Sequence, residues 1–154
     1  MTDTDPGGSD SAPTDTERGS ISAAADDTTP VVALDASALM APVEANVRLF
    51  EELDRVLGAY DSVVPAAVVD ELTQLQKGNG AAATAASVGA DLAARAETVT
   101  TDESYADDAL VELVTTGRVD GVVTTDRPLA NRVLDADAPV IGLRGRNTLA
   151  ITEP

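Results

Sequence analysis

The chain has 154 residues, which suffices for one compact domain, and it contains no cysteine and no histidine. This composition excludes disulfides, thiolate nucleophiles, imidazole bases and the usual zinc ligands, so any chemistry must use carboxylates, hydroxyls, arginines and the single lysine. The formal net charge of −17 argues against the electrostatic attraction that usually brings a protein to nucleic acid.

The first segment, residues 1–29, is rich in Asp, Thr, Ser and Gly and has almost no large apolar side chains. It cannot bury enough apolar surface to offset its ordering entropy, so we expect a disordered acidic tail followed by one domain over residues 30–154. No apolar run reaches membrane-spanning length, and the N-terminus lacks a signal pattern. A cytoplasmic protein is therefore expected.

The first half of the domain alternates apolar runs with helical spacing. Val31–Leu34 is a continuous apolar run that predicts a buried strand. Apolar residues then recur at helical spacing over Val43–Leu57. A second strand is predicted at Ser62–Val64, before a helix over Ala66–Gln76. The alanine-rich segment Ala81–Ala96 is a further helix by propensity.

The second half repeats this alternation. The predicted elements are a weak edge strand at Glu97–Thr100, a helix over Tyr105–Thr116, a buried strand at Gly121–Thr124, a short helix over Pro128–Leu134, and strands at Pro139–Gly142 and Thr148–Ile151. Short apolar strands that alternate with helices predict an α/β fold with a central, mostly parallel sheet covered by helices.

Acidic residues occur where such a sheet would end its strands. Asp35 directly follows the first strand, and Asp126 follows the strand that begins at Gly121. Glu71 lies on the helix after the second strand, and Asp107 and Asp108 lie in the first turn of their helix. Ligands of open parallel sheets collect at the carboxyl ends of the strands. Carboxylates crowded there would repel each other unless a divalent cation neutralised them, and oxygen ligands alone suit Mg²⁺ or Mn²⁺.

Each acid also has an ordinary structural explanation. Asp35 could cap a helix, and Asp126 could be a turn residue. Glu71 could be a solvated helix residue, whereas Asp107 and Asp108 could complement the positive end of a helix dipole. Only the combination of these residues indicates a metal site.

Four segments carry a resemblance to a known family. LDASAL, VVPAAVVDEL, YADDALVELV and VVTTDRPLANRV, in this order, resemble the motifs of the PIN domain, the fold of a group of metal-dependent ribonucleases. The resemblance covers about Val31 to Ile151 and is greatest to the archaeal and eukaryotic branch that includes rRNA-processing proteins, with the VapC toxins as a sister branch. It implies a three-layer α/β/α fold and hydrolysis of RNA with Mg²⁺ or Mn²⁺.

The resemblance also implies a role for individual residues. It makes Asp35, Glu71, Asp108 and Asp126 the catalytic metal ligands, with Asp107 as a supporting neighbour. Ser37 and either Thr124 or Thr125 match hydroxyl positions that support the acids. The basic residues expected to contact RNA phosphates are Arg127, Arg132, Arg144 and Arg146, although each is equally well explained as a solvated surface arginine.

Several alternatives keep this fold or belong to other acidic α/β folds. A toxin would have an antitoxin partner, and a non-catalytic PIN-like module would bind RNA or ribosomal particles without cleaving them. A receiver domain or a haloacid-dehalogenase-type phosphatase would need an acidic pair or an Asp-x-Asp motif where Asp35 stands alone. PIN relatives often form homodimers, but no sequence feature here specifies an interface.

The acidity itself has a second interpretation. The acid-rich, lysine-poor composition resembles that of cytosolic proteins from extreme halophiles. At about 1 M ionic strength the Debye length falls to about 3 Å, so like charges barely repel across the surface. This interpretation weakens the inference that an acidic protein avoids RNA.

Overall fold

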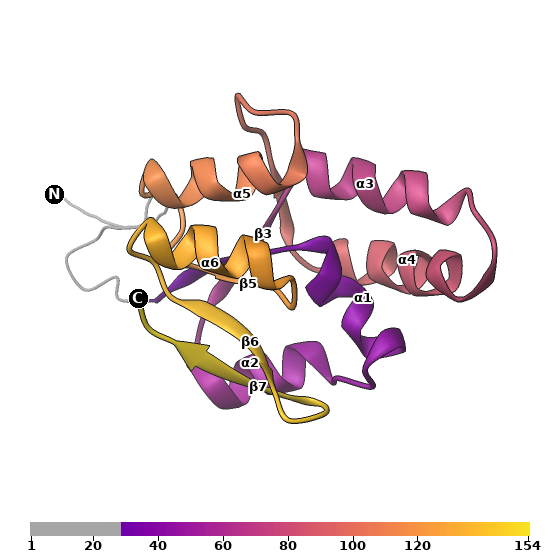
Figure 1. Cartoon of the computed structure of the whole chain (residues 1–154), viewed down its shortest axis with the longest axis horizontal. Helices are drawn as coiled ribbons and strands as arrows, with labels where there is room; N and C mark the ends of the chain where they lie inside the picture. The colour runs from indigo at the N-terminus through magenta and orange to yellow at the C-terminus, as the bar shows by residue number, and fades with distance from the viewer. Residues whose placement is uncertain (1–28) are drawn as a thin grey trace, which may run out of the picture.

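The computed structural model describes residues 29–154, so the predicted tail lies, except for Thr29, outside the described residues. A six-stranded sheet with the order β4-β3-β2-β5-β6-β7 forms the centre of the domain (Figure 1). The strands are β2 (Val31–Leu34), β3 (Asp61–Pro65), β4 (Glu97–Val99), β5 (Gly121–Val123), β6 (Val140–Arg144) and β7 (Thr148–Thr152). All neighbouring strands pair in parallel except β7, which is antiparallel to β6. The predicted α/β class and the mostly parallel sheet are confirmed.

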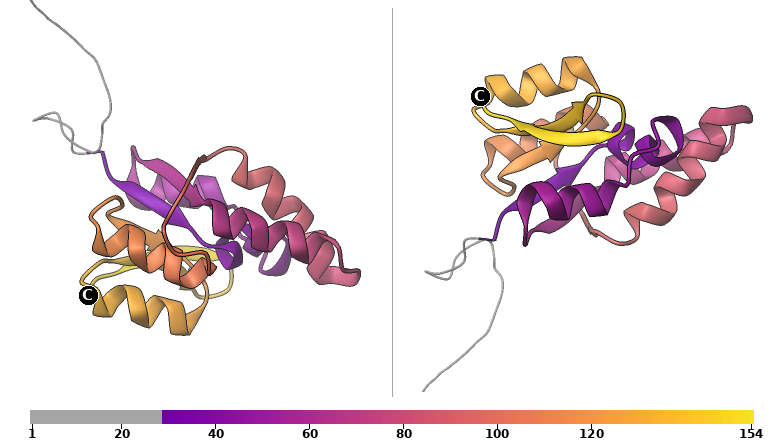
Figure 2. Two further views of the ribbon diagram at one scale, coloured as in Figure 1. Left: turned by 90° about the horizontal axis from the view of Figure 1, so that it is seen from above. Right: turned by 90° about the horizontal axis from the view of Figure 1, so that it is seen from below.

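Helices cover both faces of this sheet. They are α1 (Ala36–Glu44), α2 (Leu49–Leu57), α3 (Ala66–Gln76), α4 (Gly80–Ala93), α5 (Ala106–Thr115) and α6 (Arg127–Asp135). Figure 2 shows β6 and β7 lying between α6 and α2, while α5 and α6 lie side by side. The helices α1, α3 and α4 pack together at one end of the molecule. None of the helices in residues 29–154 has the length and apolar character needed to cross a membrane.

The core is built from aliphatic side chains. Its largest fully buried members are Leu34, Leu39, Leu53, Leu72, Leu110, Leu113, Leu129 and Ile141. The face of α4 that packs against α1 is made of small residues, and a Cβ at Gly89 would lie 3.2 Å from the Leu39 carbonyl oxygen. Small residues therefore let the backbones of these two helices approach closely, which explains the alanine-rich sequence of α4.

The predicted helix over Val43–Leu57 is correct only in its second half, which is α2 and ends at Leu57 before Gly58 as predicted. Its first half is wrong, because the chain forms two helices there. Residues 45–48 separate α1 from α2, and Asn46 adopts a left-handed φ of 55°. Asparagine tolerates this conformation better than most residues, so it breaks the helix without a glycine. Val43 belongs to α1 and is 42% exposed, so its apparent place in the apolar repeat of α2 was coincidental.

Candidate metal and nucleic-acid site

Asp35 and Asp126 lie at the ends of β2 and β5, where the strand order of the sheet reverses. From β2 the chain proceeds to β3 and β4 on one side, and later to β5 and β6 on the other. Asp35 follows β2 directly, and Asp126 follows β5 after two threonines. Because β2 and β5 are parallel neighbours, both acids lie at the carboxyl edge of the sheet, at the kind of switch point where ligands of open α/β sheets bind.

Asp35 is buried and held by hydroxyl groups. It is only 4% exposed, and its Oδ2 accepts hydrogen bonds from Ser37 Oγ and Thr124 Oγ1, each at 2.7 Å. Its Oδ1 accepts from the Ala36 backbone N–H at 2.8 Å. A buried carboxylate needs such donors, since an unpaired charge in this position would be costly. The network therefore fixes the orientation of the carboxylate that begins the site.

The same hydroxyl groups connect Asp35 to Asp126. Ser37 Oγ accepts from the Thr125 backbone N–H, and Thr124 Oγ1 accepts from the Asp126 backbone N–H, both at 3.0 Å. Each hydroxyl hydrogen is directed to Asp35, so the lone pairs remain for these two amides. Asp126 also caps α6, since its Oδ1 accepts from the Leu129 backbone N–H at 3.4 Å. Thr124 thus contacts Asp35 through its side chain, and Thr125 contributes its backbone.

Glu71 and Asp107 are coupled to these two aspartates. The pKa of Glu71 is raised, first because the surrounding protein removes water from its carboxyl group, and then because Asp35, Asp107 and Asp126 repel its negative form. Glu71 is an exposed residue as a whole, but its carboxyl group interacts electrostatically with all three of these aspartates.

The pKa of the half-buried Asp107 carboxyl is raised by the same causes. Partial burial contributes most, followed by the charges of Asp35 and Asp126, while Arg132 acts in the opposite direction. Asp35, Glu71, Asp107 and Asp126 therefore form one group of interacting negative charges, which we call the acidic edge.

Asp108, in contrast, forms an ion pair. Its Oδ1 accepts a hydrogen bond from Arg132 Nη2 at 3.0 Å, across the contact between α5 and α6. The two side chains are 40% and 47% exposed, respectively. Successive helical residues point about 100° apart, so Asp107 and Asp108 meet different neighbours. In this structure the charge of Asp107 interacts with Asp35 and Asp126, whereas Asp108 pairs with Arg132. The resemblance favoured Asp108 as the metal ligand, and the choice between the two residues stays a prediction.

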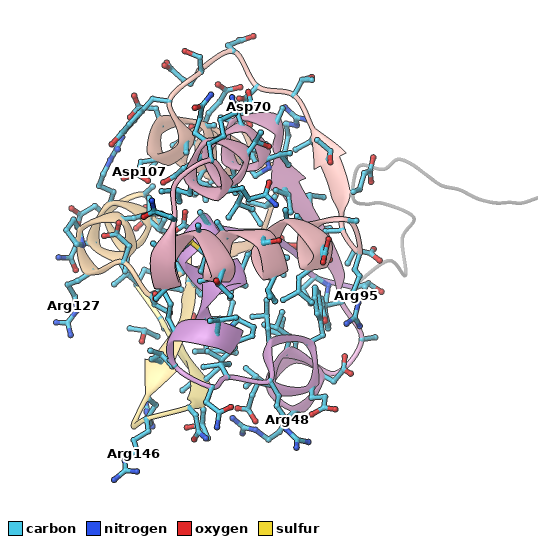
Figure 3. The ribbon with its side chains drawn as sticks, turned by 90° about the vertical axis from the view of Figure 1, so that its right-hand side faces the viewer. Arg48, Asp70, Arg95, Asp107, Arg127 and Arg146 are labelled. Atoms are coloured by element: carbon cyan, nitrogen blue, oxygen red, sulfur yellow. The ribbon has the colours of Figure 1, made fainter. Side chains whose placement is uncertain are left out.

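The predicted RNA-binding arginines occupy different places. Arg132 is the one that interacts with the acids, through Asp108 and through its effect on Asp107. Arg127 lies at the start of α6, and Arg144 and Arg146 lie at the turn between β6 and β7; all three are exposed. In Figure 3, Arg127 lies at the left edge below Asp107, and Arg146 lies at the bottom, further from Asp107 and Asp70.

The acidic edge fits a hard divalent cation in its chemistry. Its donors are carboxylate and hydroxyl oxygens, which suit Mg²⁺ or Mn²⁺. A cation would relieve the repulsion that adds to burial in raising the pKa of Glu71 and Asp107. Among the acidic residues of the described range, no three converge closely enough to form a ready-made metal site. The carboxylates therefore share one region without being fixed at coordination distance.

Comparisons with known proteins agree with the fold. A family model described as a PIN like domain matches residues 32–146. Among solved structures, the PIN domain endonuclease Utp24 is similar with a TM-score of 0.66 and 23% sequence identity, over 80% of this chain and 92% of that chain. No curated protein matches the chain.

Proposed function

Because the chain belongs to the PIN-like domain family, whose model matches residues 32–146, we propose that it is a divalent-metal-dependent endoribonuclease. The observation that carries this proposal is the acidic edge, where four carboxylates interact at the switch point of a parallel sheet. The described endonuclease activity of Utp24 is in line with the proposal, although the likeness at this identity concerns the fold.

In this proposal, Asp35, Glu71, Asp107 and Asp126 hold Mg²⁺ or Mn²⁺. Asp107 replaces Asp108 as the ligand because its charge interacts with the other acids, whereas Asp108 binds Arg132. When bound, the cation supplies an activated water and neutralises charge that develops on the phosphate during hydrolysis.

The other residues orient the acids and the substrate. Ser37 and Thr124 hold the Asp35 carboxylate, and Thr124 also fixes the backbone at Asp126. Arg132, held by Asp108 at the border of the acidic edge, is the best placed cation for a substrate phosphate. Arg127 lies at the start of α6, and Arg144 and Arg146 lie at the end of β6 and the turn after it. These three arginines would attract more distant phosphates.

The proposal is tested by RNA cleavage with Mn²⁺ or Mg²⁺ and with EDTA, at low salt and in molar KCl. We further propose that the RNA is ribosomal, as the resemblance to rRNA-processing PIN proteins implies, so structured ribosomal RNA fragments are the first substrates. The variant Asp126→Asn removes one charge but keeps the cap of α6, because asparagine caps helices as well as aspartate does. We expect metal-dependent cleavage by the wild type and a loss of at least about a hundredfold in the variant.

The alternatives give different results in the same experiment. RNA binding without cleavage at any metal concentration would contradict the nuclease and favour a non-catalytic PIN-like binding module. Cleavage that a co-expressed antitoxin suppresses would favour a VapC-like toxin over a processing enzyme. The molecular mass in solution decides whether the active form is a homodimer.

A further inference from the structure

Tyr105 is the one aromatic side chain among residues 29–154 that lies largely in solvent. The chain has one Phe, two Tyr and no Trp. Phe50 lies beneath the Arg95 guanidinium, whose carbon is 4.1 Å from the ring centre, and Tyr60 packs partly buried against the core. Tyr105 is 65% exposed. A large exposed aromatic ring needs an explanation when the protein has so few of them.

Local structure does not account for a tyrosine at this position. Tyr105 is the N-cap residue of α5, yet its side chain makes no capping hydrogen bond. Ser, Thr, Asp or Asn would stabilise this helix end by about 1 kcal/mol relative to a side chain that cannot cap. Within the described residues, the Tyr105 hydroxyl has no hydrogen-bond partner and its ring contacts no other ring. The residue therefore stabilises neither the helix nor the core.

The loop that leads to Tyr105 is nevertheless well braced. Glu112, two turns along α5, accepts hydrogen bonds from the backbone N–H groups of Asp102 at 3.0 Å and Glu103 at 2.9 Å. Arg118 Nη1 donates to the Thr100 carbonyl oxygen at 2.9 Å. These contacts hold residues 100–104 before any ligand binds. An exposed ring at the end of an ordered loop loses little further freedom when it binds a partner.

Tyr105 also lies next to the acidic edge. It precedes Asp107 by two residues, so their Cα atoms are at most about 7.6 Å apart. Asp107 in turn interacts with Asp35 and Asp126. A nucleotide whose phosphate lies at the acidic edge is therefore close enough to bring a base to the ring of Tyr105.

We infer that Tyr105 is the stacking platform for an unpaired base of the RNA substrate, in a nucleotide next to the phosphate at the acidic edge. This inference rests on the proposed function of the acidic edge. Stacking needs a base that is not already stacked in a duplex, and it works with any base. It also needs no positive charge, which suits a chain with 27 acidic and 10 basic residues. Stacking keeps its strength in concentrated salt, where phosphate contacts weaken.

The inference is tested by binding, independently of cleavage. Tyr60→Phe leaves Tyr105 as the only tyrosine, so its fluorescence reports contact with a base, and Asp126→Asn prevents cleavage of the bound RNA. We expect a short single-stranded RNA to quench this fluorescence, and an RNA abasic at the contacted position to bind without quenching. In the Asp126→Asn protein, Tyr105→Leu should weaken binding roughly tenfold at both low and high salt, whereas Tyr105→Phe should keep the affinity.

Cleavage kinetics separate this inference from the proposed function. In the otherwise unchanged protein, Tyr105→Leu should raise KM roughly tenfold and leave kcat within about twofold. Unquenched fluorescence with bound RNA, or equal affinity of Tyr105→Leu and wild type, overturns the inference even if metal-dependent cleavage is present. Quenching that depends on Tyr105, without any cleavage, supports the inference and removes the nuclease proposal instead.

Discussion

The two ends of the central strand β2 each meet an aspartate, and the two carboxylates differ in their surroundings. At the amino end, Asp120 Oδ2 accepts a hydrogen bond from the Val31 backbone N–H at 2.8 Å, and the Asp120 N–H donates to the Val31 carbonyl at 2.7 Å. This aspartate completes the hydrogen bonding of the strand. At the carboxyl end, Asp35 is held by Ser37 and Thr124 beside three further acids.

The difference shows how a fold separates stability from function. A carboxylate that accepts a backbone N–H stabilises the folded chain, usually by about 1 kcal/mol. Carboxylates that repel each other destabilise it, and a folded protein keeps such a group where binding requires it. The amino edge of this sheet is of the first kind and the acidic edge is of the second. Four predictions test this contrast.

The largest expected effect is a difference in RNA cleavage between variants of two adjacent residues of α5. Asp107→Asn should lower metal-dependent RNA cleavage by at least about a hundredfold, because Asp107 belongs to the acidic edge. Asp108→Asn should lower cleavage less than about tenfold, since it only releases the half-exposed Arg132. Single-turnover rates at saturating Mn²⁺ measure both effects. A larger loss in Asp108→Asn would reverse the assignment of the ligand.

The second prediction concerns metal binding without RNA. A ligand that binds only the folded chain stabilises it by about 2.7 kcal/mol at a concentration of one hundred times Kd. Mn²⁺ should therefore raise the Tm of the wild type by several degrees, as measured by differential scanning calorimetry. The shift should disappear in Asp107→Asn and persist in Asp120→Asn. An equal shift in both variants would mean that Mn²⁺ binds elsewhere.

The third prediction concerns the amino edge alone. Asp120→Ala removes the acceptor for the Val31 N–H and should lower the free energy of unfolding by about 1 kcal/mol in urea titrations. Asp120→Asn keeps a side-chain oxygen that can accept this hydrogen bond and should lose less. Both variants should cleave RNA like the wild type. Loss of cleavage in a stably folded Asp120→Asn would show that the two edges are not independent.

The smallest effect is in the pH dependence of stability. The raised pKa of Glu71 means that the folded state holds its proton more tightly than the unfolded chain does. Its contribution to stability is therefore complete at low pH and is lost as the pH rises from the unfolded pKa through the raised folded pKa. Glu71→Gln should remove this loss, so that at neutral pH, without divalent cations, the variant is at least as stable as the wild type.

Glu112 provides a control of opposite sign. Its pKa is lowered by the hydrogen bonds from Asp102 and Glu103. The stability that it contributes is present above the unfolded pKa and is lost as the pH falls through the folded pKa. Glu112→Gln should therefore be less stable than the wild type at neutral pH. Urea titrations from acidic to neutral pH measure how each substitution changes the free energy of unfolding. If this change had the same sign for both variants at neutral pH, Glu71 would not belong to a group of repelling charges.

The sequence predicted those parts of the fold that depend on local pattern. The strand Val31–Leu34 and the helix Ala66–Gln76 have the predicted bounds, because a continuous apolar run and an uninterrupted helical segment each end at a clear boundary. The break between α1 and α2 was missed, since it depends on Asn46 taking a left-handed conformation that nearby residues do not require. Local composition cannot distinguish a residue that tolerates this conformation from one that adopts it.

The sequence could assign each candidate acid to a strand end or a helix, but not to a face of that helix. Placing acids after β2 and β5 needs only the rule for parallel sheets. Choosing between Asp107 and Asp108 needs the rotation of α5, which its packing against α6 determines. The contacts at the outer edge of β7 could not be predicted either. Arg55 Nη2 donates to the Leu149 carbonyl oxygen at 2.7 Å, and Glu52 accepts a hydrogen bond from the Leu149 N–H at 2.9 Å. These contacts join residues far apart in the sequence, and no local signal predicts them.

The most direct test of the contrast between the two edges is the Mn²⁺-dependent cleavage rate of Asp35→Asn and Asp120→Asn, measured side by side on one single-stranded RNA. Each variant changes the same residue type by the same substitution, at opposite ends of β2. We predict that Asp120→Asn cleaves at the rate of the wild type and that Asp35→Asn loses at least about a hundredfold. Equal rates in the two variants would contradict the claim that the carboxyl edge of the sheet serves function while the amino edge serves stability.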